Sequence, residues 1–91
     1  MITVEDVEDM SMLTRAEIEA LAEHENTNTL NAALMGEYIM QLHHGPQMVH
    51  EIICDDIRSA LKSGRLEHAR ELFDVLRNFL AEHPDAARGA S

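Results

Sequence analysis

The residues best suited to chemistry in this sequence are its histidines. Six occur in 91 residues, and half of them fall within the segment 43–50. Neutral imidazole binds Zn, Fe, Cu and Ni, so this cluster is a candidate metal site. His50 and Cys54 stand four residues apart, which places both side chains on one face of a helix. The complete set is His24, His43, His44, His50, His68 and His83.

A helical hairpin centred on Gly45 would bring further ligands to this pair. If the segments on either side of Gly45 form antiparallel helices, Glu37 lies near the level of Cys54. The histidines nearest the turn then complete a set of nitrogen, oxygen and sulfur ligands suited to a transition metal such as Fe or Zn. The predicted metal ligands are Glu37, His44, His50 and Cys54.

Other features of the sequence speak against a metal. A di-iron bundle uses Glu-x-x-His pairs, and no histidine here has a glutamate three residues before it. Cys-x-x-Cys and His-Glu-x-x-His are also missing. His43, His44 and His83 stand near expected helix C-termini, where the helix dipole attracts positive charge. No cofactor is therefore the first expectation, and a metal-binding or redox-responsive helical bundle is the alternative.

Catalysis has little support in the sequence. Glu37 and Asp56 lie in apolar helical segments, where burial would raise the carboxyl pKa and suit acid–base chemistry, although such groups also pair with arginines. Cys54 has no glycine-rich turn beside it that could form an oxyanion hole. The four glycines are scattered, so there is no phosphate-binding loop. We expect a protein that is not an enzyme.

The charge is strongly acidic and unevenly distributed. Seven bases and 17 acids give a net charge of −10, which disfavours binding to nucleic acid. Residues 1–44 contain one base and nine acids, a net −8, whereas residues 45–91 contain six bases and eight acids, a net −2. This asymmetry can orient a partner or a second copy, or it can simply maintain solubility. Because histidine is the side chain that changes its charge near physiological pH, pH sensing is a third possible function beside protein binding and metal binding.

The sequence favours a cytoplasmic protein without a membrane partner. One cysteine cannot form an internal disulfide. The first ten residues are acidic, whereas a signal peptide begins with positive charge. The most apolar segment, 30–42, contains polar residues and is shorter than the roughly 20 residues that span a bilayer.

Breaker residues and apolar periodicity predict four helices and no strand. The sequence Thr14-Arg15-Ala16-Glu17 is a capping box that opens a helix ending near Glu25. Asn28 or Thr29 caps the next helix. Gly45 is expected to end that helix in a left-handed conformation, with Pro46 opening the following one. The three later helices are expected at 28–44, 46–63 and 65–83.

The apolar residues also predict how these helices pack. In the segment 30–42 they surround nearly the whole helix, which is typical of the centre of a core. In the last two helices they form one stripe each, and charged or polar residues fill the rest of each helix surface. These stripes include Ile57 and Leu61 in the first helix, and Leu66, Ala69, Phe73, Leu76 and Leu80 in the second.

Together these patterns predict an all-α fold, a small antiparallel helical bundle of three to four helices. The bundle should comprise residues 13–84, preceded by an acidic arm or short helix at 1–12 and followed by a flexible tail at 85–91. Because so few helices cannot cover the apolar segment 30–42, we expect a two-fold homodimer to complete the core.

The predicted function is interaction with other proteins, as an adaptor or regulatory binding module. Helix-face or helix-in-groove contact, with anchors every three or four residues, would be its mode. The predicted partners are a second copy of the chain and an unknown protein. Three methionines, Met35, Met40 and Met48, could form an adaptable contact surface or part of the core.

Overall fold

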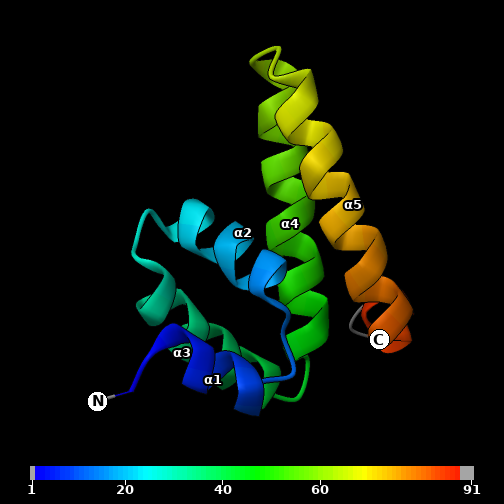
Figure 1. Ribbon diagram of the computed structural model, residues 1–91. Helices are drawn as coiled ribbons and strands as arrows, with labels where there is room; N and C mark the ends of the chain where they lie inside the picture. Colours follow the sequence, from blue (N-terminus) through cyan, green and yellow to red (C-terminus); the bar gives the residue numbers. More distant parts are fainter. Residues whose placement is uncertain (1, 89–91) are drawn as a thin grey trace.

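The computed structural model describes residues 2–88, and this part of the chain contains helices and turns but no strand (Figure 1). Four longer helices occupy the four predicted segments, and a short helix precedes them. They are α1 (Val4–Met10), α2 (Arg15–Glu25), α3 (Thr29–Met40), α4 (Gly45–Lys62) and α5 (Leu66–Glu82), followed by the 3-10 turn η1 (Pro84–Arg88). The predicted all-α class is confirmed. Within residues 2–88, no helix has both the length and the hydropathy needed to cross a membrane.

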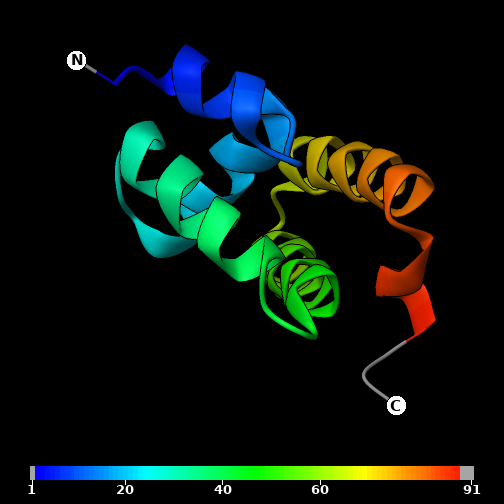
Figure 2. The same ribbon diagram turned by 90° about the horizontal axis from the view of Figure 1, so that it is seen from below.

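Helices α4 and α5 form a long antiparallel hairpin, and the other helices pack against one end of it (Figure 1). Gly64 turns the chain between them with a φ of 76°, a left-handed conformation that glycine adopts without steric cost. Helix α2 packs on α3, α4 and α5, and α1 packs on α3. Helix α3 approaches α4 at an angle instead of running beside it (Figure 2). The end of the hairpin that carries the turn therefore projects beyond the other helices.

The predicted capping residues open α2 and α3. Thr14 Oγ1 accepts a hydrogen bond from Glu17 N at 3.3 Å, and the Glu17 carboxylate accepts one from Thr14 N at 2.8 Å. This reciprocal pair satisfies two backbone N–H groups that the first turn leaves without helical partners. Asn28, rather than Thr29, caps α3 by accepting from Asn31 N at 2.8 Å.

The junction between α3 and α4 differs from its prediction. Helix α3 ends at Met40, and Gly45 is the first residue of α4 instead of a left-handed residue that ends α3. Glycine is needed there for a different reason. A Cβ atom on Gly45 would lie 1.9 Å from the Ile39 carbonyl oxygen, so only a residue without a side chain lets the start of α4 approach the end of α3.

The core lies where the hairpin meets α2 and α3. Its largest fully buried apolar side chains are Phe79, Ile18, Leu21, Ile53 and Val49. Met40 is buried with them and Met35 packs against them, whereas Met48 is 40 % exposed. Two of the three singled-out methionines therefore belong to the core.

Helix α3 is not enclosed on all sides within one chain, and its coverage by a second copy stays a prediction. Leu34 is 50 % exposed and Tyr38 is 66 % exposed. The buried face of α3 is instead made of smaller side chains, with Ala32, Ala33 and Gly36 among them. A Cβ on Gly36 would lie 2.6 Å from Leu13 Cδ1, which shows how closely the chain approaches this face. Close packing of small residues leaves the larger ones outside.

Both ends of the described chain contain more structure than a loose arm and tail. The predicted 1–12 arm contains α1, which is opened by a capping box between Thr3 and Asp6. At the other end η1 packs on α4, and Ala86 is fully buried. The packed part of the chain therefore reaches past the predicted boundary at 84. Residues 89–91 of the predicted tail lie outside the described residues.

Candidate functional site

Two of the predicted metal ligands, Glu37 and His44, have partners of their own. Glu37 Oε1 accepts a hydrogen bond from Gln41 Nε2 at 3.3 Å. The His44 ring lies beside that of His43, with 4.2 Å between the centroids. Because α3 meets α4 at an angle, the register assumed for an antiparallel hairpin at Gly45 does not apply (Figure 2).

The other two predicted ligands, His50 and Cys54, share one wall of a shallow depression of about 360 Å³ on α4. His50 is already engaged, because its Nδ1 donates to the Ala86 carbonyl oxygen at 2.9 Å. In the described part of the chain, no group of three or more His, Cys, Asp or Glu side chains could hold a metal ion. The structure therefore brings together two of the four predicted ligands and leaves Glu37 and His44 apart from them.

The Cys54 thiol is poorly suited to nucleophilic or redox chemistry. Burial raises its pKa, and the nearby Arg58 guanidinium offsets only part of this effect. The thiol therefore stays protonated at neutral pH, and the thiolate is the form that attacks electrophiles and binds metals.

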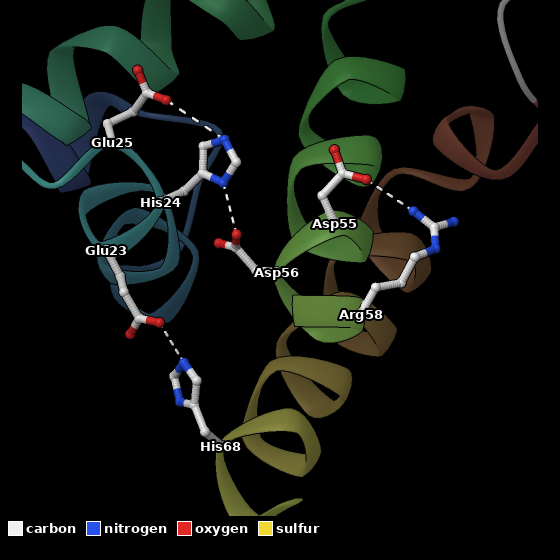
Figure 3. A network of polar contacts seen from close by, with 7 residues as sticks. All are labelled: Glu23, His24, Glu25, Asp55, Asp56, Arg58 and His68. Carbon is white, nitrogen blue, oxygen red and sulfur yellow. Dashed lines mark hydrogen bonds and ion pairs between the residues drawn. The ribbon is translucent and has the colours of Figure 1, made fainter. Parts of the chain in front are cut away.

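A polar network joins α2 to both helices of the hairpin (Figure 3). His24 Nδ1 donates to Asp56 Oδ1 at 2.8 Å, which links α2 to α4. His68 Nε2 forms a hydrogen bond with the Glu23 carboxylate, which links α5 to α2. The second nitrogen of His24 lies 3.6 Å from Glu25 Oε2. These histidines hold helices together, a role that the sequence interpretation missed because each pair is 32 or 45 residues apart in the chain.

The fully buried carboxyl group is not one of the two that the sequence indicated. Glu37 is half-buried, and its Oε2 is buried without a hydrogen-bond partner among residues 2–88. Asp56 faces His24 rather than an apolar pocket. Glu17 is instead the fully buried carboxyl, and its Oε2 has no hydrogen-bond partner among residues 2–88. Burial raises the pKa of Glu17, and the nearby Glu82 carboxylate adds to this rise. Since Glu17 lies in the core and caps α2, its position points to a structural role.

An exposed apolar surface lies at the projecting end of the hairpin. Leu61, Leu66 and Phe73 are 53 %, 64 % and 56 % exposed, whereas Ala69 and Leu76 of the same α5 stripe are buried. They line a shallow apolar depression of about 360 Å³ between α4 and α5. We call this surface the hairpin face; its residues are Ile57, Leu61, Leu66, Ala69 and Phe73.

The hairpin face lies in the most basic segment of an acidic chain. Residues 57–73 contain four bases and two acids, a net charge of +2, whereas residues 1–56 contain one base and 12 acids, a net −11. Arg58 and Arg70 are paired with Asp55 and Glu67 on their own helices. Lys62, at the projecting end, forms no ion pair within the described chain.

A second apolar stripe lies on α3 and the turn after it. Leu34, Tyr38 and Leu42 follow one another at intervals of four residues, and Leu42 is 37 % exposed. Leu34 and Tyr38 are neighbours on the helix surface, and Leu42 lies in the turn two residues beyond the end of α3; we call these three residues the α3 face. It belongs to the acidic half of the chain, where Arg15, the one base in residues 1–44, lies within 4 Å of Glu5, Glu8 and Glu19.

Comparisons of the chain with protein families, with curated proteins and with solved structures gave no match. No family is assigned to the chain for this reason. The chemistry of its exposed surfaces is then the basis on which a function can be proposed.

Proposed function

We propose that this protein acts by binding other proteins, and that the hairpin face is its docking surface. The observation that carries the proposal is the exposure of three large apolar side chains, Leu61, Leu66 and Phe73, around one depression. Contiguous exposed apolar surface costs free energy in water and marks interaction sites in folded proteins. An adaptor or regulatory binding module is the function that such a surface supports.

The shape and charge of the hairpin face suggest what it binds. A shallow apolar groove between two helices fits the apolar side of an amphipathic helix, whose anchors recur every three or four residues. The positive net charge of residues 57–73 favours a partner helix with acidic flanks. The proposed ligand is therefore an acidic amphipathic helix presented by another protein.

A synthetic peptide tests this proposal directly. The peptide would be an acidic amphipathic helix of about 20 residues with leucines at helical spacing. Its fluorescence anisotropy would be followed during titration with the protein at low concentration. We expect saturable binding, and a loss of about tenfold or more in affinity for the double variant Leu61→Gln, Phe73→Gln. Both residues are more than half exposed, so the change spares the core.

Two controls make the result specific. A scrambled peptide of equal charge has no apolar stripe and should not bind. The variant Met12→Gln removes an apolar side chain that is 55 % exposed but lies outside the hairpin face, and it should bind as the unchanged protein does. Equal binding of both peptides, or full binding by the double variant, would refute the proposal.

The predicted homodimer and the predicted cytoplasmic location remain part of the proposed function. The half-exposed apolar residues of α3 support self-association, because a second copy could cover them. The free thiol of Cys54 agrees with a reducing compartment.

A further inference from the structure

The molecule carries two separate apolar surfaces in opposite electrostatic surroundings. The hairpin face belongs to residues 57–73, whose net charge is +2. The α3 face belongs to residues 1–44, whose net charge is −8. They lie on different parts of the fold, since α3 packs near the start of α4 and the hairpin face lies beside the α4–α5 turn (Figure 1).

We propose that the hairpin face of one molecule binds the α3 face of a second copy. This inference rests on the proposed function, because it names an occupant for the same docking surface. Helix α3 shares two features with the ligand proposed above: its exposed apolar residues Leu34 and Tyr38 stand four residues apart, and its one charged side chain is the acid Glu37. The simplest closed assembly is a two-fold dimer in which this contact occurs twice.

Charge decides between this arrangement and its alternatives. Pairing of two hairpin faces would bring two segments of net +2 together, and pairing of two α3 faces would bring two segments of net −8 together. Like charges across an interface oppose association, whereas opposite charges attract. The unlike pairing also covers both apolar surfaces of each molecule, whereas either like pairing leaves one of them exposed.

Complementary surface variants test the inference. The hairpin variant is Leu61→Gln, Phe73→Gln, and the α3 variant is Leu34→Gln, Tyr38→Gln. All four side chains are at least half exposed, and glutamine supports helix formation, so both variants should remain folded. Analytical ultracentrifugation of the unchanged protein should give the mass of two chains. Each variant should dissociate about tenfold or more readily, while Met12→Gln should not.

The decisive measurement mixes the two variants. In a mixed dimer the intact α3 face of the hairpin variant meets the intact hairpin face of the α3 variant. An equimolar mixture should therefore associate more tightly than either variant alone. If hairpin faces paired with each other, the α3 variant alone would stay dimeric, and if α3 faces paired with each other, the hairpin variant alone would. Either result overturns the inference, as does a monomeric unchanged protein.

Charge reversal provides an independent measurement. Lys62→Glu with Arg65→Glu replaces two positive charges at the hairpin end by two negative ones, and the dimer should then weaken most at low salt. Unchanged dissociation would contradict the proposed electrostatic match. The peptide titration separates this inference from the proposed function. If the protein is monomeric but binds the acidic helix through Leu61 and Phe73, the dimer is refuted and the proposed function is supported.

Discussion

Replacement of Gly45 by alanine tests how the junction positions α3 against α4. The new Cβ atom would lie 1.9 Å from the Ile39 carbonyl oxygen and 2.8 Å from its carbon. Both atoms are backbone, so no side chain can rotate away, and α4 must shift relative to α3. Overpacking of this kind lowers the free energy of unfolding by about 1–3 kcal/mol. Because the obstacle here is backbone, we expect Gly45→Ala to lie at the upper end, with a loss of ~3 kcal/mol.

Thermal and urea unfolding followed by circular dichroism measure this cost. Since 1 kcal/mol corresponds to about 4–8 °C in a domain of this size, Tm should fall by about 12–24 °C. The other glycines serve as matched controls. Gly64→Ala meets no atom within 4 Å but adopts a φ of 76°, so it should cost only about 1–2 kcal/mol. Gly36→Ala meets the side-chain ends of Leu13 and Leu21 instead of backbone, and a gain of about 1 kcal/mol in helix propensity offsets part of the cost of displacing them.

The expected order of destabilisation is therefore Gly45→Ala, then Gly64→Ala, then Gly36→Ala. A Gly45→Ala protein that unfolds at the same temperature as the unchanged one would show that α4 tolerates a shift at its first turn. A cost below that of Gly64→Ala would likewise refute the reasoning from close approach. If the junction does move, the dimer should weaken as well, because Gly45 fixes the α3 face relative to the hairpin.

Two further predictions concern buried polar groups. Burial raises the pKa of Glu17 above its ordinary value of 4.5, so the folded state holds the proton more tightly than the unfolded state. The contribution of Glu17 to stability is thus greatest below the ordinary pKa and is lost as pH rises through the raised pKa. In urea unfolding from pH 4.5 to 7, the free energy of unfolding should fall with pH more steeply for the unchanged protein than for Glu17→Gln. An equal pH dependence in both proteins would contradict this. The His24–Asp56 contact should give a coupling of about 1 kcal/mol in a double-mutant cycle of His24→Ala and Asp56→Ala, and a value near zero would show that this contact does not hold α2 to α4.

The helices were predictable because their signals are local. The Thr14–Glu17 capping box and the stop at Pro84 fall within one turn of the elements they bound. The role of Gly45 was not predictable, since its reason is a contact with Ile39 across a turn. Sequence spacing shows that a glycine is needed at such a place without showing whether a left-handed conformation or a close approach requires it.

Burial was predictable in pattern but not in extent. One apolar stripe runs along α5, yet Leu76 and Phe79 are buried while Leu66 and Phe73 are exposed. The periodicity does not show which side of α5 meets α2: Leu72 and Val75 share a depression with α2, whereas Leu66 and Phe73 belong to the hairpin face. The His24–Asp56 and His68–Glu23 contacts escaped prediction for the same reason, because they depend on where α2 docks. The register of the predicted ligand set assumed an antiparallel hairpin about Gly45, whereas α3 meets α4 at an angle.

The arrangement of the helices explains why an apolar surface remains exposed. The fold is only 18 Å thick along its shortest axis, and α2 and α3 cover the part of the hairpin that contains Val49, Ile53 and Phe79. No helix of the described chain is left to cover the other end. Solubility alone would favour acidic residues around that bare surface, since the chain is acidic elsewhere. The concentration of four bases in residues 57–73 instead gives the exposed apolar end a charge opposite to the rest of the molecule, which is the pattern that attraction of an acidic helix requires.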